Sequence, residues 1–206
     1  MTSEDYSLEE GTYLVKAARH AVESLLKVPG QVPPSTASPR LREKRGAFVT
    51  IRLHPACELR GCIGRPYPSE ALIDAVKESA VDAAVGDPRF EPVTPDELSG
   101  LTFEVSVLTE PVRLEVTSPK DYRKEVVIGR DGVIVRWRGG SGLLLPQVPV
   151  EEGWDIDTYL SYACMKAGAT PDLWLSHEVG LSTFQAIVFE ETAPCGPVRK
   201  LSLEPR

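Results

Sequence analysis

Two strand-like segments separated by only four residues constrain the fold more than any other feature of this chain. Residues 46–54 and 59–64 are rich in apolar and β-branched side chains, and residues 55–58 form a short link between them. A link of this length joins antiparallel neighbours, because parallel strands need a crossover of roughly a dozen residues. Residues 101–108 alternate apolar and polar side chains, as expected for a strand of a half-buried sheet. The sequence therefore predicts a mostly antiparallel sheet.

Helix signals lie between these strand signals. Ser7 and Glu10 have the spacing of a capping box, and apolar residues then recur at helical spacing to about residue 28. Further helices are predicted over residues 69–85 and 155–167, with short ones starting at Thr94 and Ser118. A strand predicted over residues 111–116 continues or pairs with the strand at 101–108. Residues 126–128 and 133–137 are predicted to form a second hairpin, and residues 181–190 a final strand. Because the strands gather in hairpins instead of alternating regularly with helices, we expect an α+β fold.

The composition is that of an ordinary soluble globular protein. The chain has 206 residues, 42% apolar and 26% charged, which suits one domain over residues 1–206. No stretch approaches the roughly 20 apolar residues that span a bilayer, and the N-terminus lacks the pattern of a secretory signal. We therefore expect a cytoplasmic protein with no membrane partner. The chain contains no asparagine and three glutamines, a depletion of heat-labile amides that indicates a thermophilic source.

The net charge and the cysteine content indicate which ligands and partners to expect. A net charge of −7 makes nucleic acid an unexpected partner, although the basic run at residues 40–45 leaves contact with an anion or RNA open. We predict a mobile loop over residues 29–45, a flexible glycine-rich turn at 139–142 and a loosely held tail at 192–206. The four cysteines include no C-x-x-C pair and the three histidines are scattered, so we expect no metal site.

The segment at residues 59–64 (L-R-G-C-I-G) carries the main candidate for chemistry. Cys62 lies between Gly61 and Gly64, and neighbouring cations such as Arg60 make a thiol easier to ionise. The glycines allow a ligand or another backbone segment to approach closely, which makes them candidate ligand-binding residues. Cys62 is thus a candidate nucleophile or ligand contact. The alternative is a small buried apolar side chain, since free cysteine is among the most buried residue types.

The register of the hairpin decides between these interpretations. With a four-residue loop, Cys62 lies opposite Ile51, an apolar setting that suits an inert thiol. With a three- or five-residue loop the register shifts by one, and Arg52 joins the face of Cys62 together with Thr50 or His54. The sequence leaves both registers open. It also leaves open a disulfide between Cys57 and Cys62, which would need their Cα atoms within about 7 Å.

Three further side chains are candidate site residues. Glu104 lies on the polar face of its predicted strand, where a buried carboxylate needs a partner, and we expect Arg60 to pair with it. Acid–base chemistry is the alternative role of Glu104. Arg89, in the turn at residues 87–90 (D-P-R-F), has a guanidinium able to bind an anion through two N–H groups. Gln147 follows a proline in an apolar run, where it either satisfies buried backbone groups or lines a ligand site.

Several of these segments together resemble the AMMECR-type domain proteins, the family named after the AMME syndrome candidate protein. The segments are residues 59–64, residues 87–90, residues 142–148 (G-L-L-L-P-Q-V), Trp154 and residues 164–168 (C-M-K-A-G). They occur in the family's order, and the resemblance covers essentially the whole chain. It implies an α+β domain of about this length, with a mostly antiparallel sheet, flanking helices and a smaller second lobe.

The resemblance does not imply a mechanism. The family is described as having no established biochemical activity, and some relatives occur beside or fused to Memo-like or radical-SAM proteins, which implies a partner of that kind. One hypothesis is an enzyme or ligand-binding domain with a cleft around Arg60, Cys62 and Glu104 for a small anionic or nucleotide-like molecule. The other is a non-catalytic module that binds a protein or RNA. Neither hypothesis names a cofactor, and the sequence does not decide whether the chain is an enzyme.

Overall fold

The computed structural model describes residues 6–30, 32–33 and 38–203, which form two compact units. The first unit contains the described residues of 1–110 and 187–201, and the second those of 111–186 and 202–203. Each unit combines a β-sheet with helices, which confirms the predicted α+β class. Within the described residues, no helix has the length and apolar character needed to cross a membrane.

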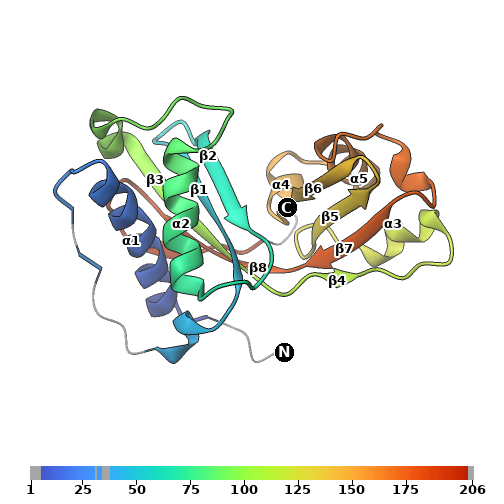
Figure 1. Cartoon of the computed structure of the whole chain (residues 1–206), viewed down its shortest axis with the longest axis horizontal. Coiled ribbons are helices and arrows are strands. Elements are labelled where there is room, and N and C mark those ends of the chain that lie inside the picture. The colour runs from blue at the N-terminus through green and yellow to red at the C-terminus, as the bar shows by residue number, and fades with distance from the viewer. Residues whose placement is uncertain (1–5, 31, 34–37, 204–206) are drawn as a thin grey trace. The chain divides into compact units, whose positions relative to one another are not determined.

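The first unit is a five-stranded sheet with two long helices on one face (Figure 1). The strand order is β2-β1-β3-β8-β9, with β1 antiparallel to both β2 and β3. Its helices, with 3₁₀ helices labelled η, are α1 (Leu8–Leu25), η1 (Pro39–Arg42), α2 (Leu72–Val85) and η2 (Pro95–Gly100). Its strands are β1 (Gly46–Leu53), β2 (Glu58–Arg65), β3 (Leu101–Leu108), β8 (Ala186–Glu191) and β9 (Val198–Lys200).

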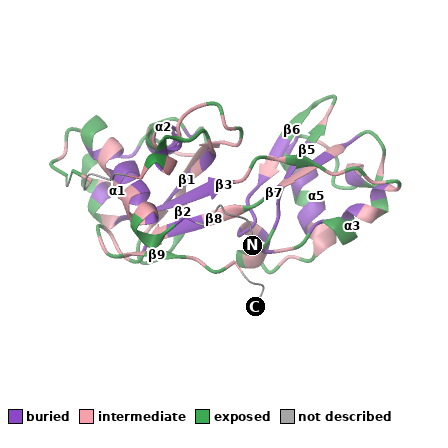
Figure 2. Cartoon of the chain, turned by 90° about the horizontal axis from the view of Figure 1, so that it is seen from below, coloured by how far each residue is buried: buried purple, intermediate pink, exposed green. Residues whose placement is uncertain are grey.

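The core of the first unit lies between the sheet and these helices. Alternate residues of β1 and β3, among them Val49, Ile51 and Phe103, are fully buried there, and the strands of this sheet include long buried stretches in Figure 2. The predicted capping box starts α1: Glu10 N–H donates to Ser7 Oγ at 3.2 Å, and Ser7 N–H donates to Glu10 Oε2 at 2.8 Å. The other residues of each strand point to the opposite face of the sheet, where the polar candidates lie.

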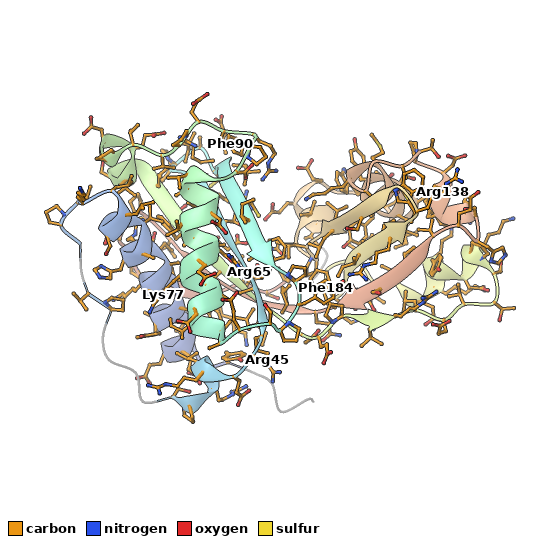
Figure 3. The ribbon with its side chains drawn as sticks, in the orientation of Figure 1. Arg45, Arg65, Lys77, Phe90, Arg138 and Phe184 are labelled. Atoms are coloured by element: carbon orange, nitrogen blue, oxygen red, sulfur yellow. The ribbon has the colours of Figure 1, made fainter. Side chains whose placement is uncertain are left out.

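Arg65 fastens the end of β2 to α2. Its guanidinium lies 3.0 Å from each of three carboxylates, those of Glu70, Glu78 and Asp82, and it is labelled beside α2 in Figure 3. Glu78 and Asp82, four residues apart, lie on the same side of α2, and Glu70 lies just before the helix. Arg65 thus connects the strand to the helix through ion pairs, although in the sequence it lies only three residues after Cys62.

The second unit is a four-stranded sheet in the order β4-β7-β5-β6. Its strands are β4 (Val112–Arg113), β5 (Gly132–Trp137), β6 (Gly140–Leu144) and β7 (Gly180–Phe184). Its helices are η3 (Pro119–Asp121), α3 (Tyr122–Glu125), α4 (Val148–Glu151), α5 (Ile156–Lys166) and η4 (Leu173–Leu175). Tyr159 of α5 is fully buried and donates its hydroxyl to the carbonyl of Asp131 at 3.0 Å, which ties the helix to the sheet.

Three strand predictions are wrong. Residues 112–113 pair with β7 and not with the strand at 101–108. The partner of β5 in the second hairpin is β6, not residues 126–128, so the glycine-rich segment is largely strand and only residues 138–139 turn. Gly142 lets β6 pack closely against the end of α5, because a Cβ there would lie 2.4 Å from the backbone nitrogen of Ala167. The predicted strand at 181–190 is interrupted at Gln185, and its halves β7 and β8 belong to different sheets.

The two segments expected to be loose also contain structure. Within residues 29–45, η1 places Leu41 in the core at 2% exposure, and Lys44 forms an isolated bridge with Ala71. The rest of that prediction falls partly on residues 31 and 34–37, outside the described residues. Within the tail, residues 198–200 form β9, which pairs with β8 through a register that sets Val198 opposite Glu191. The tail therefore contains a strand that was not predicted.

Candidate functional site: a thiol on the polar face of the first sheet

The hairpin adopts the register that places Cys62 in polar surroundings. Leu53 pairs with Glu58, so the loop is residues 54–57, and a β-bulge at Arg60 then shifts the pairing by one residue. Beyond the bulge, Cys62 lies opposite Thr50 and not opposite Ile51. The shift comes from the bulge and not from a loop of three or five residues. One extra residue therefore turns the half-buried thiol to the polar side of the sheet.

Cys62, Thr50 and Glu104 form a row across three neighbouring strands. Thr50 lies opposite Cys62 on one side and opposite Glu104 on the other. The Thr50 hydroxyl donates to Cys62 Sγ at 3.4 Å. Glu104 is only 3% exposed, and Arg52 brings its Nε within 3.9 Å of Glu104 Oε2. A thiol, a hydroxyl and a buried carboxylate with a cation beside it therefore share one face of the sheet.

The turn at residues 87–90 clamps the backbone of Cys62. β2 is an edge strand, and the Cys62 N–H donates to Asp87 Oδ2 at 2.9 Å. Arg89 Nη2 donates to the Cys62 carbonyl at 3.2 Å and to Asp87 Oδ2 at 2.6 Å, while Arg89 Nε donates to Asp87 Oδ1 at 2.9 Å. The motif thus satisfies the open edge of the strand at the position of the thiol. The contact between this turn and the backbone of Cys62 was not predicted.

Hydrogen bonds to Asp87 make the clamp dependent on pH. Those from the Arg89 side chain, together with the N–H groups of Cys62 and Arg89, outweigh burial and lower the pKa of Asp87 to about 2. The unfolded chain titrates near 3.8, so the ionised group stabilises the fold above about pH 4, and this contribution is lost as the pH falls through about 2. The shift corresponds to about 2 kcal/mol.

We expect Asp87→Asn to lower the free energy of unfolding by about 2 kcal/mol at pH 7, because the neutral amide cannot hold Arg89 in the same way. Urea denaturation at a series of pH values measures the difference from the wild type. It should shrink as the pH falls toward about 2, where the wild-type carboxylate is protonated as well. Asp96→Asn, at an exposed position of η2, is the control. A difference that stays constant from pH 7 to pH 2 would contradict the role of the carboxylate charge.

Arg60 does not pair with Glu104 as expected. Arg60 Nε donates to Glu97 Oε1 at 2.9 Å and Arg60 Nη2 to Glu97 Oε2 at 3.3 Å, because the bulge directs the side chain toward η2. This pairing lowers the pKa of Glu97. Nη1 of Arg60 is buried without a hydrogen-bond partner among the described residues. The guanidinium carbons of Arg60 and Arg89 lie 6.0 and 5.4 Å from the centre of the Phe90 ring, which is labelled in Figure 3.

The two glycines of the motif serve packing contacts. A Cβ on Gly61 would lie 2.1 Å from the carbonyl oxygen of Ala83, so the close approach it permits is to α2. A Cβ on Gly64 would lie 2.3 Å from the ring of Phe48. Gln147 is 3% exposed and belongs to the second unit, where it directly precedes α4. The structure therefore brings Cys62, Arg60, Glu104 and Arg89 into the first unit and leaves Gln147 in the other.

Further reactive thiols or groups that could bind a metal ion would be the other candidate sites among the described residues. All four cysteines are free thiols, with Cys57 and Cys195 exposed and Cys164 buried. Burial raises the pKa of Cys164 to about 11, which makes it inert. Among the described residues, no group of three or more histidine, cysteine, aspartate or glutamate side chains is arranged to hold a metal ion.

Comparison with known proteins shows to which protein family the chain belongs. The AMMECR1 family model matches residues 15–189. Protein MK0488 of Methanopyrus kandleri is 51% identical over 201 residues, covering 97% of each chain, and protein MJ0810 of Methanocaldococcus jannaschii is 47% identical, covering 93% of this chain and 95% of the relative. The crystal structure of protein PH0010 from Pyrococcus horikoshii superposes with a TM-score of 0.87 at 44% identity, covering 93% of this chain and 96% of the other. With a family match over most of its length and relatives of this similarity, the chain belongs to the AMMECR1 family.

Proposed function

We propose that this chain is a small-ligand-binding domain whose ligand carries an anionic group and meets the thiol of Cys62. The observation that carries the proposal is the row of Cys62, Thr50 and Glu104 on the polar face of the sheet. A carboxylate that is 3% exposed costs free energy to bury, and buried ionisable groups of this kind cluster at functional sites. A thiol that accepts a hydrogen bond from a neighbouring hydroxyl is better able to carry negative charge.

Two arginines beside Cys62 support an anionic ligand. Arg89 is half exposed and uses Nε and Nη2 within the clamp, so Nη1 is left for a ligand. The buried Nη1 of Arg60, whose guanidinium carbon lies 6.0 Å from the centre of the Phe90 ring, lacks a hydrogen-bond partner among the described residues. Guanidinium groups bind carboxylates and phosphates through such N–H groups. The half-buried Phe90 ring, close to both guanidinium groups, adds an aromatic contact for a planar, nucleotide-like ligand.

Chemistry at this site would use the thiol as a nucleophile. The S–H bond of Cys62 breaks as its proton passes to a base, and the sulfur adds to a carbonyl carbon of the ligand, so that the C–S bond forms while the electron pair of the C=O π bond moves onto the carbonyl oxygen. Glu104 lies opposite Thr50 on the next strand, so it would receive the proton through the Thr50 hydroxyl, which would turn to accept the proton of the thiol and pass its own to the carboxylate. The positions of Thr50 and Glu104 thus give each a role in the same step.

Alkylation of the native protein with iodoacetamide at pH 7, read out for each cysteine by peptide mass spectrometry, tests the proposal. We expect Cys62 to react faster than the exposed Cys57, although Cys62 is half-buried. Thr50→Val removes the hydroxyl and should slow the reaction of Cys62 by about tenfold, since a hydrogen bond to a charged group contributes about 1.5 kcal/mol. Thr50→Ser keeps the hydroxyl and is the matched control. Reaction of Cys62 only after addition of denaturant would refute the proposal.

A further inference from the structure

A pocket of about 340 Å³ lies within the first unit. One wall is a face of α1, and the others are the segment that follows α1 and the turn between β8 and β9. The side chains that matter for its chemistry are Lys16, Arg19, Glu23, Glu191 and Cys195. None of these residues belongs to the site around Cys62. The volume suits a molecule as small as an amino acid or a dipeptide.

The floor of the pocket is an ion pair that is already complete. Arg19 donates from Nε to Glu191 Oε1 at 2.7 Å and from Nη2 to Glu191 Oε2 at 2.5 Å, and Nη2 also donates to the carbonyl of Leu101 at 2.6 Å. Glu191 Oε2 accepts a further hydrogen bond from the N–H of Phe103 at 3.1 Å. The two charges cancel and are fixed in place. Recognition of a ligand therefore falls to the other charged groups of the lining.

Among the described residues, Glu23 provides a carboxylate that feels the charge of the neighbouring Arg19 but has no lysine or arginine within salt-bridge distance. Its side chain is 9% exposed, and the contact with His20 Nδ1, at 3.8 Å, is longer than a hydrogen bond. It also lies in the last turn of α1, where the helix dipole disfavours negative charge. Burial raises the pKa of Glu23. Gly30 makes room for the carboxylate, since a Cβ there would lie 1.8 Å from Glu23 Oε2. A ligand cation at this point would offset both the cost of burying the negative charge and its unfavourable interaction with the helix dipole.

Lys16 provides a cation on the same side of the helix. It precedes Glu23 by seven residues, two helical turns, which separates the Cα atoms by about 10 Å. Lys16 is half-buried and takes part in no ion pair or hydrogen bond among the described residues. The two groups available to a ligand thus have opposite charges at opposite ends of one face of α1.

We propose that this pocket binds a small zwitterion of the amino-acid or short-peptide class, with its ammonium group at Glu23 and its acid group at Lys16. A simple anion would meet the repulsion of Glu23, and a simple amine would leave Lys16 desolvated without a partner. A ligand with both charges, separated by several bonds, satisfies each end.

Cys195 lines the same pocket and reports its occupancy. We would measure iodoacetamide labelling of Cys195 by peptide mass spectrometry with and without 5-aminopentanoate, using Cys57, exposed and outside the pocket, as the internal control. We expect 5-aminopentanoate to protect Cys195 and not Cys57. Pentanoate and pentylamine each lack one charge and should need about tenfold higher concentration, because one ion pair of about 1.4 kcal/mol is lost. Equal protection by either compound, or none by 5-aminopentanoate, would overturn the proposal.

Variants of the two charged groups complete the test. Glu23→Gln and Lys16→Met should each abolish the protection of Cys195 by 5-aminopentanoate. Glu9→Gln, at an exposed position of the same helix, should leave it unchanged. Thermal denaturation of each variant establishes that α1 is still folded. Undiminished protection in both folded pocket variants would overturn the proposal. The rate of labelling of Cys62, measured in the same samples, tests the proposed site beside Thr50 independently of this pocket.

Discussion

Replacing Glu191 with alanine is expected to reduce the free energy of unfolding by about 3 to 5 kcal/mol, the range found when one partner of a buried ion pair is removed. The side chains of Arg19 and Glu191 are 7% and 2% exposed. Without the carboxylate, the Arg19 guanidinium stays buried over the Phe103 ring, 4.6 Å from its centre, with only carbonyl partners. The N–H of Phe103 loses its acceptor as well. The pair joins α1, β3 and β8, so its loss loosens the whole first unit.

Urea denaturation followed by circular dichroism measures this change. Glu190→Gln is a closely matched control, because the neighbouring glutamate pairs with Arg199, whose side chain is 63% exposed. That surface pair should contribute less than about 1 kcal/mol. The double variant Arg19→Met with Glu191→Leu should recover much of the loss, since no unpaired charge remains. If Glu191→Ala were no more destabilising than Glu190→Gln, the buried pair would not have the role described.

Gly61→Ala is expected to reduce the free energy of unfolding by about 2 to 3 kcal/mol, at the upper end for an added methyl group in a packed interior. The new Cβ would lie 2.1 Å from the carbonyl oxygen of Ala83, in the backbone of α2, so no side-chain rotation relieves the clash. Either α2 or β2 must move away from the other. Because Cys62 follows Gly61 directly, the movement should also change the rate at which Cys62 is alkylated.

Gly100→Ala serves as the comparison for this substitution. Nothing lies within 4 Å of a Cβ at Gly100, and replacing a glycine where space allows is neutral or slightly stabilising. Thermal and urea denaturation of the two variants should therefore differ clearly. Equal stabilities would show that the glycine of the motif is not required for packing against α2.

Local signals in the sequence predicted the fold class and most elements of the first unit. The alternation over residues 101–108 matches β3 (Leu101–Leu108), since the apolar residues of one face lie in the core. The expectation of a half-buried strand is wrong, because seven of its eight residues are buried and the polar face is covered as well. The capping boxes at Ser7 and Thr94 start α1 and η2 at the predicted residues. These signals depend on hydrogen bonds within four residues, so the sequence alone is enough to find them.

The register at Cys62 depends on a feature that sequence patterns do not reveal. The bulge at Arg60 forms because Arg60 is held by Glu97 from η2 and Gly61 packs against α2. Both contacts join segments that are distant in sequence. The partner of Glu104 was mistaken for the same reason, since the bulge directs Arg60 to Glu97, and the Nε of Arg52 lies 3.9 Å from Glu104 Oε2.

The pocket beside α1 was missed although one residue indicated it. Arg19 occurs within the apolar face of α1, beside Val15, Ala18 and Val22, where an arginine is buried only with a partner. That partner, Glu191, is 172 residues away along the chain, and no local pattern connects the two. The break in the predicted strand at Gln185 was missed for a comparable reason. Both halves have the composition of a strand, but β7 and β8 belong to different sheets, which no local pattern indicates.

The proposal that Cys62 faces a site for an anionic ligand is tested most directly by comparing two alkylating reagents. Iodoacetate and iodoacetamide differ in charge, and the ratio of their rates at each cysteine of the native protein reports the local preference. With Arg89 and Arg60 beside Cys62, the iodoacetate-to-iodoacetamide ratio should be higher at Cys62 than at the exposed Cys57. Arg89→Gln should reduce it, and Arg113→Gln, on the exposed β4, should not. A ratio at Cys62 equal to or below that at Cys57 would contradict the proposed function.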